Sequence, residues 1–298
     1  MAEPAIAEPD VGSSAALAAR HGLTVAGARP GLLRYTRQLW AYRHFIVAYA
    51  NAKVASSYSS TALGRLWQVL TPLTNAAVYF LIFGLIVDSP GRPTNFIGYL
   101  CTGLFVFIFT QTAVSSGLQA IAGNLGLIRA LHFPRASLPL SLTLVQLQNI
   151  IASMAVLAAI VLLTGEPLSF EWLLVVPALL LQSIFNAGLA LAMARIGARM
   201  RDLKQIMPFI LRTWMYGSAV LYSVALFDSP EIPDAVSALL KANPLLIYIE
   251  LMRHSLMETA PLGSPVWLLW TLGLGWALLV GVGGYLFFWR GEQEYGRG

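Results

Sequence analysis

Charged side chains are scarce in this chain. They make up 11% of its 298 residues, whereas hydrophobic residues make up 57%. A soluble domain carries about 25% charged residues, so the composition predicts an integral membrane protein. A single cysteine, Cys101, excludes an intrachain disulfide. The sequence does not open with an apolar core and a small-residue cleavage site, so we expect no signal peptide.

Several kinds of catalytic chemistry lack their usual residues. No lysine follows a glycine, which excludes a phosphate-binding loop ending in Gly-Lys-Ser/Thr. The four histidines lack metal-ligand spacing, and no carboxylate lies inside an apolar run, where proton-coupled transporters usually need one. No set of nucleophile, acid and base is visible, as an intramembrane enzyme would need. These absences predict a conduit that binds no cofactor or metal and takes its energy from another protein.

Long apolar runs account for most of the chain. A helix needs about 20 predominantly apolar residues to cross the hydrocarbon core of a bilayer, and six runs reach that length. We therefore expect an all-α integral membrane protein with six transmembrane helices in residues 66–298. The runs lie between Arg65 and Asp88, Arg92 and Arg129, Arg135 and Glu166, Glu171 and Arg195, in residues 203–227, and between Glu258 and Arg290.

The fifth run, residues 203–227, is the most unusual one. It carries Arg212 about a third of the way in, together with Trp214, Tyr216 and Tyr222. A charge near the bilayer centre costs about 2.5–3.5 kcal/mol, and a purely structural membrane helix has no need of it. Either this helix lines a pathway, or Arg212 extends to the headgroups and the rings form an interfacial belt.

The basic residues fall on one side of these runs. All except Arg92, Lys241 and Arg253 lie in the N-terminal part, the second-to-third and fourth-to-fifth connections, or the C-terminal end. Most of the acidic residues lie on the other side. Basic residues are retained in the cytosol, so we expect both termini there. The net charge of +5 thus reflects topology and does not indicate a nucleic-acid partner.

The residues before the first run divide into two parts. Residues 1–30, rich in Ala, Pro, Gly and Ser, are expected to form a disordered cytosolic tail. In residues 31–65, apolar positions recur at steps of three and four, which predicts an amphipathic helix. Tyrosine fills half of these positions, so the helix is expected along the membrane interface, with packing on protein as the alternative. The residues assigned to it and to its junction with the first span are Arg34, Arg37, Tyr42, Tyr49 and Trp67.

The connection before the last run is too long for a simple turn. After Asn243 and Pro244 it contains LLIYIELMRHSLM, which has helical spacing but is too short to span a bilayer. Glu250 and Arg253, three residues apart, are expected to pair on its polar face. We expect a re-entrant or interfacial helix at the outer mouth, or a helix that only caps the bundle.

Three segments in this order resemble those of one family. They are YSSTALGRLWQVLTPL (58–73), NLGLIRALHFPRASLPL (124–140), and RDLKQIMPFILRTWMYGSAVLYS followed by NPLLIYIELMR. From about Leu32 to its end, the chain resembles the membrane subunit of ABC-2-type polysaccharide exporters, the family of Wzm, TarG and the capsule-export permeases. Ala219 stands where that family commonly has proline.

The resemblance implies an assembly and an activity. It implies a homodimer of six-span subunits in the bacterial inner (plasma) membrane, paired with two copies of a separate ABC ATPase that binds ATP and magnesium. The chain itself would not be an enzyme, and the assembly would export a lipid-linked polysaccharide. O-antigen, teichoic acid, capsule and actinobacterial cell-wall galactan all stay open as the glycan, and the alanine-rich composition points weakly to galactan.

The resemblance also implies roles for particular residues. The second motif corresponds to the coupling element that docks on the ATPase, and the first and fifth spans line the channel, where aromatic rings suit the apolar faces of sugars. The coupling candidates are Arg129, His132, Phe133, Pro134 and Arg135; the channel candidates are Tyr79, Phe83, Phe105, Arg212, Trp214, Tyr216 and Tyr222; the external-gate candidates are Asn243, Pro244, Glu250 and Arg253.

Two other functions stay open at this point. One is an integral membrane enzyme of glycan assembly, such as a polymerase or acyltransferase, which would need a catalytic set of side chains. The other is a small-molecule ABC-2 drug exporter.

Overall fold

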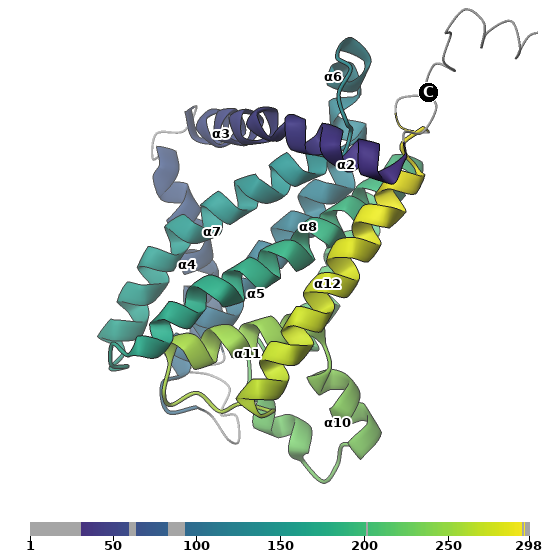
Figure 1. The fold of residues 1–298 in the computed structure, drawn as a ribbon. Helices are drawn as coiled ribbons and strands as arrows, with labels where there is room; N and C mark the ends of the chain where they lie inside the picture. The colour runs from purple at the N-terminus through teal and green to yellow at the C-terminus, as the bar shows by residue number, and fades with distance from the viewer. Residues whose placement is uncertain (1–30, 60–63, 83–92, 201, 294, 296–298) are drawn as a thin grey trace, which may run out of the picture.

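A computed structural model describes residues 31–59, 64–82, 93–200, 202–293 and 295. Their regular structure is helical, and the long helices run side by side in one bundle (Figure 1). The expected tail of residues 1–30 lies outside the described residues. Short 3-10 turns in the described residues are η1 (Gly64–Leu66), η3 (Ala122–Asn124), η4 (Phe170–Leu174) and η5 (Val224–Asp228).

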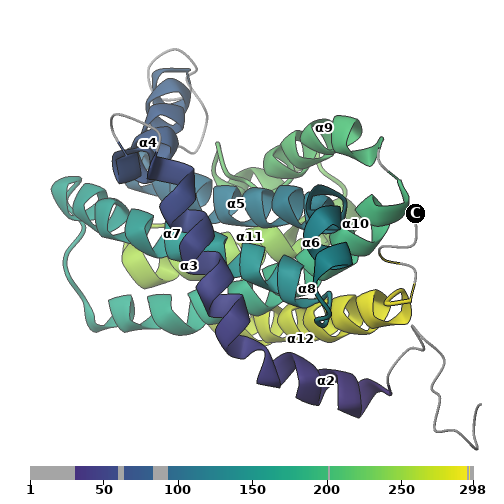
Figure 2. The ribbon, with the colours of Figure 1, turned by 90° about the horizontal axis from the view of Figure 1, so that it is seen from above.

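Four of the six expected spans form long helices. They are α5 (Phe96–Gln119), α7 (Ser137–Leu163), α8 (Val175–Arg199) and α12 (Val266–Arg290). Each is long and apolar enough to cross a membrane. Most residues of α5 are buried, as expected of a helix that is apolar on all sides. In the view from above, α12, α8 and α5 follow one another, and α4 and α9 lie beyond α5 (Figure 2).

Shorter helices stand in the described part of the first run and in the fifth run. They are α4 (Trp67–Phe80), after which the described residues reach Ile82, and α9 (Leu203–Tyr216), each with 14 residues. At 1.5 Å per residue such a helix extends about 21 Å, less than the hydrocarbon core of about 30 Å. After α9 the chain turns at Ala219, whose φ of 45° is one that a proline ring cannot adopt. The residue that departs from the family pattern therefore lies at the turn that ends the helix.

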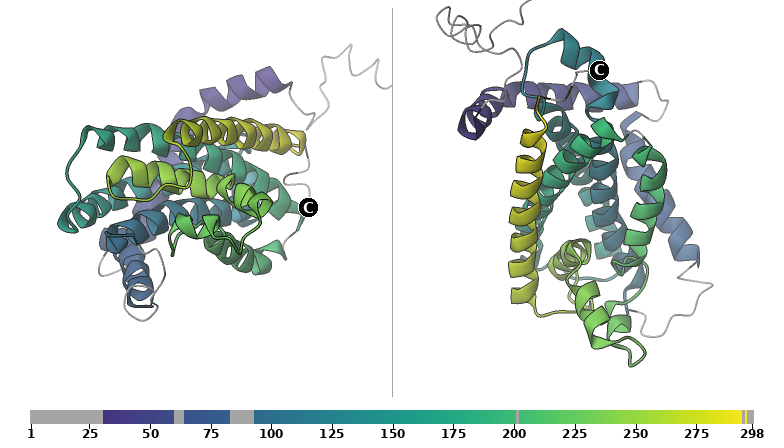
Figure 3. Two further views of the ribbon diagram at one scale, coloured as in Figure 1. Left: turned by 90° about the horizontal axis from the view of Figure 1, so that it is seen from below. Right: turned by 90° about the vertical axis from the view of Figure 1, so that its right-hand side faces the viewer.

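Two helices fill the connection before the last span. Helices α10 (Asp234–Lys241) and α11 (Pro244–Leu256) meet at an angle of 67° and together are apolar enough to be one broken span or a re-entrant segment. They lie at the end of the bundle away from α2 and α3 (Figure 1, and Figure 3, right). Most residues of α11 are buried. The described residues thus contain four membrane-capable helices, or five with this bent pair counted as one span.

The expected amphipathic helix is two helices. Helices α2 (Leu32–Ala41) and α3 (Arg43–Ser59) lie across one end of the bundle, beside α6 (Leu125–Ala130) (Figures 1 and 2). Tyr35 and Ala50 are buried against the protein, whereas Arg34, Arg37 and His44 are exposed. Tyr42, which the periodicity places on the apolar face, is exposed, so the predicted pattern agrees with the structure only in part.

Helices α8 and α12 touch through their backbones. A Cβ built on Gly188 would overlap the carbonyl of Val280, and one built on Gly284 would overlap the carbonyl of Gly188. Glycine at both positions lets the two helices approach closely. Small residues serve this purpose in membranes, where packing rather than the hydrophobic effect draws helices together.

Replacement of Gly284 by alanine tests this contact. The added methyl group would force the helices apart, and overpacking of this kind costs about 1–3 kcal/mol. We expect a lower thermal midpoint for the purified chain, measured by size-exclusion chromatography after heating in detergent. Gly283→Ala is the matched control, because a Cβ there meets nothing within 4 Å among the described residues. Equal midpoints for the two variants would contradict the prediction.

Candidate functional site

Helix α4 lies against α5 with a cleft on each side. One cleft, of about 260 Å³, lies between α4, α5 and α7, and we call it the α7-side cleft. The other, of about 200 Å³, lies between α4, α5 and α9, and we call it the α9-side cleft. Ile108 of α5 contributes to both. Three residues predicted for the channel, Tyr79, Phe105 and Arg212, line these clefts, as does Trp67, which was predicted for the junction with the first span.

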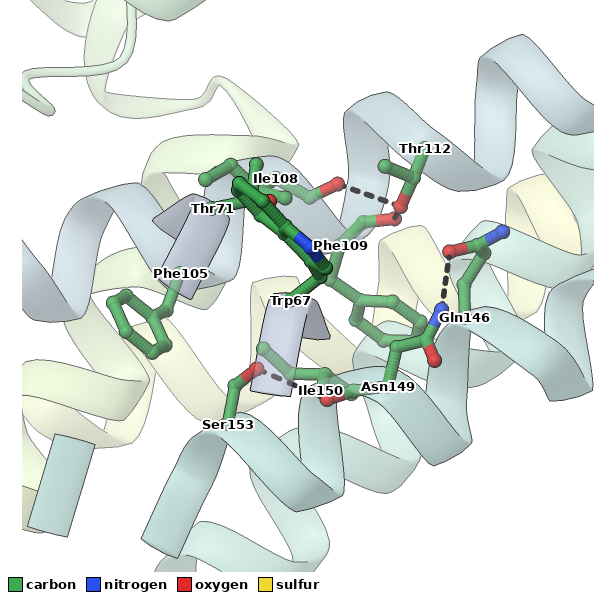
Figure 4. A pocket seen from close by; sticks show the side chains of 10 residues that line it. All are labelled: Trp67, Thr71, Phe105, Ile108, Phe109, Thr112, Gln146, Asn149, Ile150 and Ser153. Carbon is green, nitrogen blue, oxygen red and sulfur yellow. Dashed lines mark hydrogen bonds between the residues drawn. The ribbon is translucent and has the colours of Figure 1, made fainter. Parts of the chain in front are cut away.

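The α7-side cleft combines rings with amides and hydroxyls (Figure 4). The Nδ2 atom of Asn149 donates to Oε1 of Gln146 at 3.2 Å, and the hydroxyl of Thr112 donates to the carbonyl of Ile108. An apolar wall with a few polar groups is typical of a ligand-binding cleft. The lining residues are Trp67, Thr71, Phe105, Ile108, Phe109, Thr112, Gln146, Asn149, Ile150 and Ser153.

The α9-side cleft brings together residues from the first and fifth runs. Tyr79 of α4 and Arg212 of α9 line it, with Gln111 of α5 beside them. Nothing in the sequence indicated that Gln111 would lie beside Tyr79 and Arg212. A ring, a guanidinium and an amide form a surface that can bind a polar, uncharged ligand.

Three other predicted pathway residues, Trp214, Tyr216 and Tyr222, do not line either cleft. Trp214 donates its indole N–H to Oδ1 of Asn243 at 2.9 Å. Tyr216 is half-exposed, and the Tyr222 hydroxyl donates to the Tyr216 carbonyl. Phe83 lies outside the described residues. The rings predicted for one pathway are therefore distributed over α4, α5 and the end of α9.

Asn243 joins the end of α9 to the start of α11. Its Oδ1 accepts from Trp214 and, as the cap of α11, from the Leu245 N–H at 3.1 Å. Its Nδ2 donates to the Gly217 carbonyl at 2.9 Å and to Oγ of Ser218 at 2.8 Å. Pro244, at the first position of α11, lacks the N–H that a helix start leaves unpaired. The Asn243 side chain thus both accepts and donates hydrogen bonds, and Pro244 begins α11 without an unpaired N–H.

Arg253 is fully buried and holds the turn that follows α9. Its Nη2 donates to the carbonyls of Tyr99, Ala219 and Val220 at 3.1–3.3 Å. The guanidinium also lies over the Tyr99 ring, 3.3 Å from its centroid. A guanidinium suits this place because several carbonyls converge on one flat group.

Glu250 does not pair with Arg253. Its Oε1 accepts from the Gly263 N–H at 2.6 Å, on the way to α12. The predicted pair was wrong because each side chain meets backbone groups that are distant in sequence. Both residues are buried, so α11 is a packed element of the bundle and not an exposed cap.

At the other end, the predicted coupling residues divide into two groups. Arg129 and His132 are exposed, at and after the end of α6. Phe133 packs its ring on Phe45 of α3, with 5.2 Å between centroids. Pro134 is buried, and the Arg135 guanidinium donates to the main-chain carbonyl of Glu292. Only the first group therefore faces outward.

The N-terminal helices hold this same loop. The Tyr42 hydroxyl donates to the His132 carbonyl at 3.2 Å, and the Tyr49 hydroxyl donates to Oδ1 of Asn124 at 2.9 Å. Burial raises the pKa of Tyr49, which keeps its hydroxyl protonated as a donor. The tyrosines read from the sequence as headgroup-level residues thus also serve as contacts to the loop after α5.

Comparison with known proteins gives one consistent match. Residues 45–257 match the family described as the ABC-2 type transporter. The chain is 26% identical to the O-antigen export system permease protein RfbA of Myxococcus xanthus, over 78% of this chain and 89% of that protein. It is 27% identical to RfbA of Klebsiella pneumoniae over 72% and 80%. It is 23% identical to the polysialic acid transport protein KpsM of Escherichia coli over 69% and 78%.

Replacing Asn243 tests the joint between α9 and α11. Asn243→Ala removes the partners of the Trp214 indole N–H and the Gly217 carbonyl, which are partly buried, and each lost hydrogen bond costs about 1 kcal/mol. Asn243→Asp keeps both acceptor bonds and loses both donor bonds, so we expect a smaller fall in thermal midpoint. The midpoints would be measured on purified chain in detergent. An alanine variant as stable as the wild type would contradict the prediction.

Proposed function

Because the chain belongs to the ABC-2 type transporter family, we propose that it is the membrane permease subunit of an ATP-driven exporter of lipid-linked polysaccharide. The observation that carries this proposal is the family match over most of the chain, together with relatives named for the export of O-antigen and polysialic acid. These two glycans differ in chemistry, which supports the substrate class and leaves the individual glycan open.

The energy for export would come from a partner. The chain has no Gly-Lys pair, so a separate ABC ATPase would bind ATP and magnesium, two copies to a permease dimer. Its docking surface would be α6 and the loop that follows, with Arg129 and His132 outermost. Support comes from their exposure and from the position of α6 at the end of the bundle (Figure 1).

The proposed placement follows the charges. Both termini, α2, α3 and α6 would lie on the cytosolic side of the bacterial inner membrane, with α2 and α3 along its surface. The bent pair α10 and α11 would form a re-entrant external gate, with α4 and α9 as the first and fifth of six crossings. Exposed Arg34 and Arg37 on α2, opposite buried Tyr35, support the surface position.

The glycan would pass between two copies along α4, α5 and α9. Helix α9 exposes a row of large apolar side chains, Ile206, Phe209 and Ile210, which a second copy or lipid would cover. In the α9-side cleft, the Tyr79 ring can pack against the apolar C–H face of a sugar, and Gln111 and Arg212 can donate to its hydroxyls. Weak contacts of this kind allow a long polymer to slide.

Charge reversal at Arg129 tests the docking surface. We expect Arg129→Glu to weaken binding of the ABC ATPase about ten-fold, because a rim charge sets electrostatic complementarity. Arg129→Lys is the matched control and should bind as the wild type does. Affinity purification through the permease, followed by titration of the ATPase, measures both. If wild-type chain from native membranes binds no ABC ATPase, the exporter loses its energy source, and a glycan-assembly enzyme becomes the better proposal.

Substitution of Tyr79 tests the pathway. Tyr79→Phe keeps the ring and should keep most export, whereas Tyr79→Ala should lower it several-fold, because the stacking surface is lost. Surface glycan would be measured in a host whose own copy of the gene is deleted. Unchanged glycan with altered efflux of hydrophobic compounds would favour a small-molecule exporter instead.

A further inference from the structure

A buried carboxylate links three separate parts of the chain at the α2 end of the bundle. Glu292 follows α12 and is 7% exposed. Its Oε2 accepts from the Tyr35 hydroxyl of α2 at 2.7 Å. Its Oε1 accepts from the Arg135 backbone N–H at 3.1 Å, and the Arg135 guanidinium donates to its main-chain carbonyl. The Ala136 N–H donates to the Tyr35 hydroxyl at 3.2 Å, which closes the network.

These hydrogen bonds fix the position of the loop between α6 and α7. Burial raises the pKa of Glu292, while the hydrogen bonds from Tyr35 and Arg135 lower it. Burial also raises the pKa of Tyr35, so its hydroxyl stays protonated and donates. Three of these four bonds come from residues 135–136, where the α6 loop enters α7, and the fourth joins Tyr35 to Glu292. A displacement of that loop would therefore carry α2 and the end of α12 with it.

We propose that Glu292 and Tyr35 are positioning residues that fix the loop between α6 and α7 and so transmit movement of a docked ATPase into α7 and α12. This inference rests on the proposed function. Without the link, α6 and its loop would move when the ATPase moves, but α7 and α12 would follow less. ATP hydrolysis would then be less effectively linked to the conduit.

A second contact between α2 and α12 supplies a matched control. The hydroxyls of Thr36 and Tyr285 lie 2.8 Å apart, and this hydrogen bond joins α2 to α12 without a group of the loop. Tyr285→Phe therefore removes one hydrogen bond that holds α2 on the bundle and leaves the loop contacts in place. Tyr35→Phe removes one hydroxyl from the same helix pair, but takes the loop contact with it.

The position of the loop is measured on the permease alone. Spin labels at exposed Leu131 and Arg290, after Cys101→Ser, report the distance between the loop and the end of α12 in lipid nanodiscs. We expect Tyr35→Phe and Glu292→Gln to broaden the distance distribution, and Tyr285→Phe to leave it as in the wild type. Equal distributions for Tyr35→Phe and Tyr285→Phe would overturn the inference.

The effect on coupling is measured on the complex with the ABC ATPase. We expect Tyr35→Phe and Glu292→Gln to lower kcat for ATP hydrolysis about five-fold, with the ATP KM and the affinity for the ATPase within two-fold of wild type. The double variant should resemble the single ones, because each breaks the same link. Tyr35→Phe, which loses one hydroxyl, decides the test if Glu292→Gln does not fold.

The two proposals fail in different ways. A wild-type chain that binds no ABC ATPase overturns the proposed function and this inference with it. A wild-type complex that hydrolyses ATP, with Tyr35→Phe and Tyr285→Phe equally active, overturns the inference alone.

Discussion

The backbone contact between α8 and α12 at Gly188 and Gly284 is the constraint on which the rest of the structure depends. In lipid, apolar side chains gain little by leaving the bilayer, so helices hold together through close packing and polar bonds. Gly197 of α8 makes a similar approach to the Leu118 carbonyl of α5 on its other side. The order α12, α8, α5 is thus set by residues that have no side chain.

Polar bonds secure the two ends of this core. At the α11 end, buried Glu166 accepts from Asn95 before α5 and from the Glu258 N–H after α11. At the α2 end, Glu292 takes the corresponding role for the loops around α12. A buried carboxylate is costly unless donors surround it, so each one fixes the groups that satisfy it. The hydrogen bonds that offset the cost of burying the two carboxylates therefore also hold the loops in place.

The sequence predicted the elements better than their contacts. Length and apolar composition located the four long helices. The step of three and four residues agrees with buried Tyr35, but Tyr42 of the same pattern is exposed. The end of α9 at Tyr216 was missed, because residues after it stay apolar while the backbone turns at Ala219. Arg135 was assigned to docking from the resemblance, and its bond to Glu292, 157 positions away, was not foreseen. Hydropathy does not predict which residues pair over such a distance in the sequence. It likewise does not predict the carbonyls that surround Arg253.

The distribution of these restraints separates a fixed part of the bundle from a part that can move. Helix α8 contacts the backbones of both α5 and α12, so these three helices have little freedom to move relative to one another. Helix α4 instead lies between two clefts, and α9 is held at its end by the side chain of Asn243. A conduit must change its width as a polymer passes, which requires elements with more than one stable position. Helices α4 and α9 lie on the side of α5 away from α12 (Figure 2). In the proposed complex, movement of the α6 loop would therefore be transmitted through α5, α8 and α12 and would displace α4 and α9.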